Sequence, residues 1–215
     1  MNEFDIKAAG WDLNLMHIER SEAIAKQIIE RIPLKKSMIA MEFGAGTGIT
    51  SFLLKDHLGE ISMLDNSTEM VRIMNEKLNS SGAENMKPIY FDLEKEVWNR
   101  NKFDLIFNQM VLHHVDDTAG IINKFFDMLQ PGGYLAIADL YPEDGSFHGN
   151  GFNGHKGFDP EELSSLLEKT GFRNITVKKC FEINKQITDK ELKHFDLFLM
   201  VAECGINQVR YKKEY

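Results

Sequence analysis

Short apolar runs and amphipathic segments alternate along most of the chain. A short unbroken apolar run is typical of a strand buried on both faces, whereas apolar residues three or four positions apart indicate a helix with one buried face. The predicted strands are residues 38–41, 61–64, 88–91, 102–108 and 134–140, and the predicted helices between them are residues 47–58, 67–78 and 118–129. Strands that alternate with helices in this way predict a mainly parallel sheet.

The last third of the chain departs from this alternation. Asp159 and Pro160 have the character of a helix start and Gly171 that of a helix end, while residues 175–181 and 197–202 are two further predicted strands. The connection between these strands is shorter than a parallel crossover with a full helix requires, so we expect them to be antiparallel. The whole pattern predicts an α/β fold: a doubly wound, Rossmann-like, seven-stranded and mostly parallel sheet with one antiparallel edge strand and helices on both faces.

The first part of the chain precedes the sheet. Residues 18–32 have an amphipathic helical pattern that Pro33 ends. A helix in this position can lie across the top of the sheet, so we predict a single domain, residues 1–215, with residues 1–33 as an N-terminal helical lid. In the simplest interpretation, Trp11 packs the end of the chain. Arg20 could approach the carboxylate of a ligand, but we expect it to lie solvated on the helix face.

A glycine-rich turn follows the first predicted strand. Residues 38–48 read MIAMEFGAGTG, with an acid at Glu42 and glycines at alternate positions. A strand, a glycine turn and a helix form a common entry point for a nucleotide cofactor, because glycine lets a ligand approach the backbone and the helix start offers N–H groups. Dinucleotide sites use G-x-G-x-x-G, but here the third glycine, Gly48, comes one residue early. Glu42 would repel a diphosphate and could bind an amino group, which favours a cofactor with a cationic amino-acid end and no phosphate.

Two further acids end predicted strands. Asp65 lies 17 residues after Gly48, close to the spacing expected of a carboxylate that binds a ribose diol. Asp92 follows the third predicted strand and could accept a hydrogen bond from an adenine amino group. Each acid also has a simpler interpretation, Asp65 as a turn residue and Asp92 as a helix cap.

Four motifs connect these features. They are F-x-x-x-A-x-x-W-D at residues 4–12, E-F-G-A-G-T-G at 42–48, F-D-L-I-F-N-Q-M-V-L-H-H-V at 103–115 and L-x-P-G-G at 129–133. The set resembles the class I S-adenosylmethionine-dependent methyltransferases, in particular the group of quinone-biosynthesis and small-metabolite enzymes. The resemblance implies in-line transfer of a methyl group from S-adenosylmethionine to an O, N or C atom of a small-molecule acceptor. The cofactor-binding residues that it implies are Trp11, Glu42, Gly44, Ala45, Gly46, Gly48, Asp65, Asn66, Met70, Asp92, Leu93, Asn108 and Gln109.

Histidine is the candidate for proton transfer. A general base is needed only where the acceptor must lose a proton, and histidine suits that role near neutral pH. Of the four candidates His113, His114, His148 and His155, we take His113 and His155 as the catalytic ones. Their spacing fits no compact ligand motif, so no metal is expected. Two alternatives stay open: a non-catalytic module that binds S-adenosylmethionine or S-adenosylhomocysteine, and a nicotinamide-dependent oxidoreductase.

Charge and composition mainly exclude partners. The formal net charge is -8, and without basic clusters the chain is a poor candidate for nucleic-acid binding. No apolar stretch is long enough to span a bilayer, so no membrane insertion is expected. Two cysteines make neither a disulfide framework nor a zinc motif, and the polar N-terminus is not a signal peptide, so we expect a cytoplasmic protein. The sequence does not predict the oligomeric state.

Overall fold

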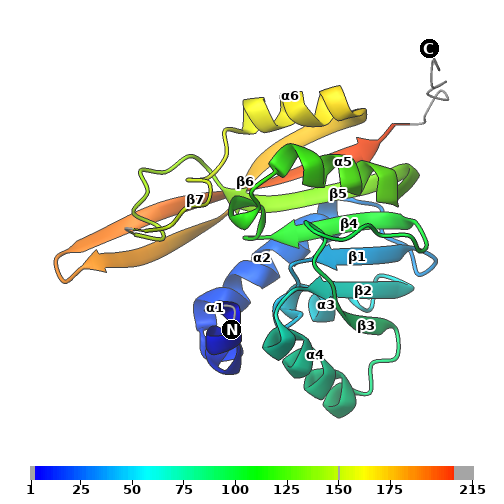
Figure 1. Cartoon of the computed structure of the whole chain (residues 1–215), viewed down its shortest axis with the longest axis horizontal. Coiled ribbons are helices and arrows are strands. Elements are labelled where there is room, and N and C mark those ends of the chain that lie inside the picture. Colours follow the sequence, from blue (N-terminus) through cyan, green and yellow to red (C-terminus); the bar gives the residue numbers. More distant parts are fainter. Residues whose placement is uncertain (1–2, 150, 206–215) are drawn as a thin grey trace.

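The computed structural model describes residues 3–149 and 151–205, and its centre is a seven-stranded sheet (Figure 1). The strands are β1 (Ile39–Phe43), β2 (Glu60–Asp65), β3 (Met86–Tyr90), β4 (Phe103–Gln109), β5 (Leu129–Leu140), β6 (Phe172–Thr188) and β7 (Glu191–Cys204). Their order across the sheet is β3-β2-β1-β4-β5-β7-β6, and β7 is antiparallel to both of its neighbours while the other pairs are parallel. The predicted fold is confirmed, with the reversed strand one place inside the edge strand β6. Residues 1–2, 150 and 206–215 of the predicted domain lie outside the described residues.

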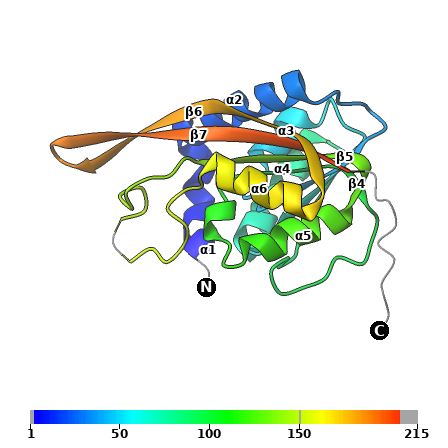
Figure 2. The same cartoon turned by 90° about the horizontal axis from the view of Figure 1, so that it is seen from above.

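Helices cover both faces of the sheet, as Figure 2 shows for α2 and α3 on one side and α5 and α6 on the other. The helices are α2 (Leu15–Arg31), α3 (Ile49–Leu54), α4 (Thr68–Ser81), α5 (Thr118–Met128) and α6 (Pro160–Thr170). Each face has its own apolar cluster: Ile28 of α2, Leu54 of α3 and Met74 of α4 belong to one, and Phe125 of α5 and Leu167 of α6 to the other. Burial on both faces explains why the central strands are unbroken apolar runs.

The parallel strands bring the predicted site segments to one edge of the sheet. The glycine turn follows β1, Asp65 is the last residue of β2, and Gln109 is the last residue of β4. In open α/β sheets, ligands bind outside the carboxyl ends of the strands, close to the point where the strand order reverses. That point lies here between β1 and β4, beside the glycine turn.

Strands β6 and β7 extend beyond the rest of the sheet as a two-stranded arm (Figure 1). The sequence predicted two shorter strands, 175–181 and 197–202, whereas the structure has a long hairpin whose strands meet at Thr188 and Glu191. The pairing continues because apolar residues recur inside the arm: Ile183 and Phe195 lie opposite each other, and both are buried.

The chain before β1 divides into two parts. The short helix α1 (Glu3–Lys7) and the 3₁₀ helix η1 (Ala8–Leu13) contact α4, whereas α2 packs against α3 and β6. Residues 3–13 therefore lie near the carboxyl edge of the sheet, and α2 lies on one of its faces. The lid role of residues 1–33 stays a prediction, and the structure limits it to the first of these parts. Within the described residues, no helix is both long and apolar enough to cross a membrane.

Candidate functional site

A cavity of about 250 Å³ opens at the carboxyl edge of the sheet. Its walls come from α1, the glycine turn, the end of β2, and the segments that follow β3 and β4. Five predicted cofactor residues line it: Gly44, Asp65, Asn66, Asp92 and Leu93. The structure thus brings together acids that are distant in the sequence, as the topology predicted.

The turn from Gly44 to Gly48 forms one wall. Gly44 has a φ of +64°, and a Cβ atom there would overlap the side chain of Val111. Only glycine fits this position, because it tolerates the left-handed backbone and has no side chain. The N–H of Gly46 donates to Oδ2 of Asp65 at 2.7 Å, which ties the turn to the end of β2.

The remaining residues of the turn complete its geometry. The N–H of Ala45 donates to the carbonyl of Leu64 at 2.9 Å, and Ala45 is buried. Gly48 is the N-cap of α3, with a φ of +79°. The turn is therefore held on one side by β2 and continues on the other into a helix.

The Asp65 carboxylate is held in a fixed orientation. Oδ2 accepts from Gly46, and Oδ1 accepts from the N–H of Ser67 at 2.8 Å. Burial raises the pKa of Asp65 to about 6, against the effect of these backbone hydrogen bonds. Each oxygen keeps a further acceptor position, as a contact to a ribose diol requires. The adjacent Asn66 lines the same cavity.

Glu42 is fully buried beneath the turn. Its Oε2 accepts from the hydroxyl of Ser51 at 2.5 Å and from the N–H of Ser51 at 3.2 Å, while Oε1 has no hydrogen-bond partner among the described residues. Burial raises the pKa of Glu42 to about 8. A buried carboxylate oxygen without a donor is costly, and a nearby ammonium group would relieve that cost. The amino-acid end of S-adenosylmethionine therefore fits this part of the site.

The N-terminal segment is attached to the glycine turn. Asp12 accepts hydrogen bonds from Thr47 and, at 2.8 Å, from Lys77. The Trp11 ring lies over the turn, since a Cβ atom on Gly46 would be 3.8 Å from its Nε1. Trp11 thus lies where a cover for the predicted cofactor would be.

Asp92 lines the cavity. It also makes the contacts expected of a helix cap, which is the simpler interpretation of this residue. Oδ1 accepts from the N–H of Glu94 at 3.2 Å, and Oδ2 pairs with Lys95 at 2.7 Å. These charged contacts hold the pKa of Asp92 below its usual value despite the opposing effect of desolvation. The next residue, Leu93, is buried against the core on one side of the cavity.

The other eight predicted cofactor residues do not line this cavity. Five of them, Trp11, Glu42, Ala45, Gly46 and Gly48, lie in or against the glycine turn described above, and the remaining three lie elsewhere. Met70 is buried in the first turn of α4. Gln109 donates to the hydroxyls of Ser21 at 2.9 Å and Thr50 at 2.5 Å, so it joins β4 to α2 and α3. Asn108 is buried, and both polar atoms of its side chain lack a partner among the described residues. Their roles toward the cofactor stay predictions, although unpartnered Asn108 is a candidate for a polar ligand group.

His113 is held by a buried acid at the end of β5. Its Nδ1 lies 2.6 Å from Oδ1 of Asp139, and its backbone N–H donates to Oδ2 of the same residue at 3.3 Å. Both side chains are almost fully buried. Asp139 is not among the predicted site residues. An acid at the end of an otherwise apolar strand was its only sequence signal, and the contact with His113 joins residues distant in the chain.

The other histidines have different surroundings. His114 lines the cavity. Nε2 of His155 lies 3.0 Å from the carbonyl of Val115 and 3.2 Å from the hydroxyl of Thr118. The carbonyl can only accept, so Nε2 carries the proton in this contact and His155 fixes the loop to the segment after β4. A catalytic role of His155 stays a prediction.

The expectation for Arg20 was wrong. Its side chain is buried, because α2 packs its face onto the sheet and the arm, and Nε has no partner among the described residues. Burial lowers the pKa of Arg20 to about 10, while the charge of Asp139 acts in the opposite direction. A helical pattern alone does not show that a polar position faces a neighbouring sheet.

Comparisons with known proteins agree with this geometry. A family model described as a methyltransferase domain matches residues 34–171. An uncharacterized methyltransferase of Schizosaccharomyces pombe is 28% identical over 159 residues, which are 66% of this chain and 56% of that protein. The malonyl-[acyl-carrier protein] O-methyltransferase of Enterobacter lignolyticus is 25% identical over 173 residues, 75% of this chain and 66% of that protein. The chain thus spans little more than half the length of the first of these relatives.

A solved structure has the same fold. The phosphoethanolamine N-methyltransferase 2 of Haemonchus contortus in complex with S-adenosyl-L-methionine superposes with a TM-score of 0.69 at 16% identity, covering 96% of this chain and 61% of that one. At this identity the likeness shows the fold. Because the family model matches well over half of the chain, the chain belongs to the methyltransferase-domain family and is a class I S-adenosylmethionine-dependent methyltransferase domain.

Proposed function

We propose that this chain transfers a methyl group from S-adenosylmethionine to a small-molecule acceptor. The observation that carries the proposal is the one cavity that gathers Gly44, Asp65 and Asp92 at the carboxyl edge of the sheet. Bare backbone beside two strand-end carboxylates is suited to an adenosine, and the buried Glu42 is suited to an amino-acid end. Membership of the family supports the reaction class, whereas the acceptor depends on the site itself.

On the cofactor side, the protein binds and aligns. S-adenosylmethionine, when bound, supplies a methyl group on a positively charged sulfur. Asp65 accepts hydrogen bonds from the ribose hydroxyls, in an orientation that Gly46 and Ser67 fix in advance. Glu42 accepts from the amino group, directly or through a water molecule, and the positive charge of that group favours the ionised form of Glu42. Asp92 accepts from the adenine amino group. Such prior orientation lowers the entropic cost of alignment.

On the acceptor side, the proposal centres on His113. Asp139 occupies Nδ1 of its ring, which leaves Nε2 as the nitrogen that can take a proton from an acceptor. Asp139 acts through His113 and is a positioning residue. The names of two proteins compared above, one similar in sequence and one in fold, refer to O-methylation of malonyl-[acyl-carrier protein] and to N-methylation of phosphoethanolamine. Small carboxylic acids, amines and phenols are therefore the first acceptors to screen.

We also propose that the chain is a cytoplasmic enzyme and that it binds no nucleic acid. Cys180 and Cys204 are free thiols, which a reducing compartment maintains. The net charge of -8 disfavours contact with a phosphate backbone.

Calorimetric titration with S-adenosylmethionine, S-adenosylhomocysteine and NADH tests the cofactor. We expect the two sulfur compounds to bind and NADH not to bind. Asp65→Ala should weaken S-adenosylhomocysteine binding by about 10- to 150-fold, because charge-assisted hydrogen bonds are lost. Asp56→Ala is the matched control, since the Asp56 side chain is 79% exposed and pairs only with the neighbouring Lys55 among the described residues.

Three outcomes would contradict the proposal or one of its parts. Unchanged affinity in a folded Asp65→Ala protein would remove Asp65 from the site. NADH binding without S-adenosylhomocysteine binding would favour an oxidoreductase. If the sulfur compounds bind but no acceptor is methylated, the chain is a binding module, and the transfer step of the proposal fails.

A further inference from the structure

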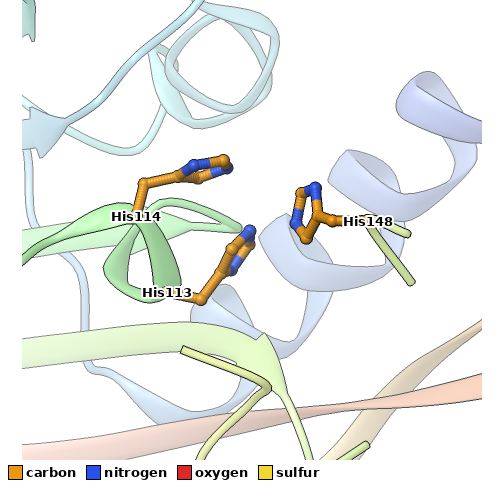
Figure 3. Close-up of side chains that lie close together, drawn as sticks. All are labelled: His113, His114 and His148. Atoms are coloured by element: carbon orange, nitrogen blue, oxygen red, sulfur yellow. The ribbon is translucent and has the colours of Figure 1, made fainter. Parts of the chain in front are cut away.

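Three histidines gather beside the cofactor cavity. Figure 3 shows the rings of His113, His114 and His148 turned toward one another, and one ring nitrogen from each lies within 4.8 Å of the others. His113 and His114 belong to the 3₁₀ helix η2 (Leu112–His114), which follows β4. His148 comes from the loop between β5 and α6. The spacing of the histidines in the sequence did not predict a metal site, because only the folding of the chain brings His148 to the other two.

His113 is oriented as metal-ligating histidines usually are. Such a histidine donates its second ring N–H to a carboxylate or a carbonyl group, which fixes the tautomer and the ring orientation. Nδ1 of His113 makes this contact with Asp139 at 2.6 Å, so the nitrogen that remains for a ligand is Nε2. Asp139 also accepts from the N–H of Leu140 at 2.8 Å, so the carboxylate itself is held.

The position of His148 is built by the surrounding loop. Its ring stacks on Phe152 with the ring centroids 3.9 Å apart. The adjacent Phe147 is buried against Phe195 of the arm, and its carbonyl accepts from Lys185 of the same arm. Oε2 of Glu143 accepts from the N–H of Phe147 at 3.0 Å. His148 thus reaches the cluster from a loop that several independent contacts secure.

We propose that His113, His114 and His148 form a binding site for a divalent transition-metal ion of the zinc type. Three neutral imidazoles with a fourth position left for an exchangeable ligand are a common donor set for such an ion. A tetrahedral zinc site places its nitrogens about 3.3 Å apart, given Zn–N distances of about 2.0–2.1 Å. His148 is exposed, so its side chain can move by the small distance that closes the set around an ion.

His114 is also a wall of the cofactor cavity, so an ion held by the three histidines would lie next to that cavity. An acceptor with a hydroxyl or thiol group that occupies the fourth position gives its proton to solvent, since coordination lowers the pKa of the donor atom. In the metal-loaded protein, Nε2 of His113 is a ligand, and the ion takes over the role of the base. This step rests on the proposed methyl transfer, whereas metal binding itself does not.

Metal affinity is the direct test. The full-length protein competes for Zn²⁺ with a chromophoric chelator, and Co²⁺ is added separately while its visible absorption is recorded. We expect one ion per chain and the intense visible bands of four- or five-coordinate Co²⁺, in place of the weak bands of the hydrated ion. His148→Ala and His114→Ala should each weaken Zn²⁺ binding by at least about tenfold. Loss of a residue that only hydrogen-bonds to a metal ligand already costs about 10- to 100-fold, and loss of a ligand should cost no less. His57→Ala, which removes an exposed histidine outside the cluster, should bind as the wild type does.

Asp139→Asn tests the supporting contact. Because the amide keeps the volume of the carboxyl group but weakens the hold on His113, we expect Zn²⁺ binding to fall about 10- to 100-fold. Equal Zn²⁺ affinity in the wild type, His148→Ala and His114→Ala proteins would overturn the site and leave an aromatic packing cluster. A protein that binds S-adenosylhomocysteine but shows no Co²⁺ bands overturns the metal site alone. One that shows the Co²⁺ bands but binds no sulfur cofactor overturns the proposed function alone.

Discussion

Two carboxyl groups, the buried Glu42 and the half-buried Asp65, lie next to the glycine turn. Burial raises the pKa of Glu42 to about 8 and that of Asp65 to about 6. Carboxyl groups with perturbed pKa values are typical of binding sites, which keep polar groups ready for a ligand at a cost to stability. Oε1 of Glu42 shows this cost directly, since it has no hydrogen-bond partner among the described residues.

Replacing Glu42 should therefore change how stability depends on pH. The folded-state pKa lies above the unfolded value, so the folded protein binds more protons and loses stability as pH rises from about 4.5 to 8. The slope from this group is at most about 1.4 kcal/mol per pH unit. Glu42→Gln cannot ionise, so its free energy of unfolding should rise relative to the wild type across this window, by up to about 5 kcal/mol in total.

Urea unfolding at a series of pH values measures this difference. Glu84→Gln is the control, because Glu84 is exposed, and its curve should run parallel to that of the wild type. Asp65 titrates in all three proteins, so the difference between the curves reports Glu42 together with its charge interaction with Asp65. Parallel curves for Glu42→Gln and the wild type would show that Glu42 does not titrate with a raised pKa.

At the scale of elements, the turn between β1 and α3 lies over Glu42 and forms one wall of the cavity. Gly44 and Gly82 have nearly the same positive φ, +64° and +66°. A Cβ atom on Gly44 would overlap Val111, whereas one on Gly82 would meet nothing within 4 Å. The pair therefore separates backbone strain from the steric effect.

Gly82→Ala should lower the free energy of unfolding by about 1–2 kcal/mol, the cost of a left-handed backbone. Gly44→Ala carries the same cost and should lose about 1–3 kcal/mol more through overpacking. It should also weaken S-adenosylhomocysteine binding, which Gly82→Ala should leave within about twofold of the wild type. Chemical unfolding and calorimetry measure both effects, and equal losses in the two variants would show that the turn moves away from Val111 without cost.

The elements differ in how far the sequence predicted them. The strands, the helices and the glycine turn follow from local patterns, because each is defined by the period of its own apolar residues. The arm was predicted too short, since Ile183 and Phe195 support each other only across the hairpin. The surroundings of Arg20 and Asp139 likewise depend on tertiary packing. Arg20 lies on the face of α2 that is turned to the sheet. Asp139, in β5, contacts His113, which follows β4.

At the scale of the whole molecule, the arm connects the far edge of the sheet with the site. Phe195 packs against Phe147 with the ring centroids 5.1 Å apart. Lys193 bonds to Asp144 at 2.6 Å and to the hydroxyl of Ser146 at 3.1 Å. The arm thus holds the loop that carries His148, whereas the cofactor cavity beside that loop is built mainly from β1, β2, the glycine turn and the segments after β3 and β4. Acceptor and cofactor binding should respond separately to changes in the arm.

Phe195→Ala tests this separation. Phe195 is 5% exposed, and its removal should destabilise the protein by about 3 kcal/mol, toward the lower end for a buried phenylalanine because the cavity left lies close to the surface. Amide hydrogens of residues 143–149 should exchange faster, since the loop loses its main apolar contact. The affinity for S-adenosylhomocysteine should stay within about twofold, while KM for the acceptor should rise.

Leu192→Ala on the same strand is the matched control, because Leu192 is 53% exposed and should change none of these quantities. If Phe195→Ala does not fold, Phe195→Leu preserves much of the volume and should show the same pattern more weakly. A loss of cofactor affinity equal to the change in KM would mean that the arm supports the whole carboxyl edge and not the acceptor side alone.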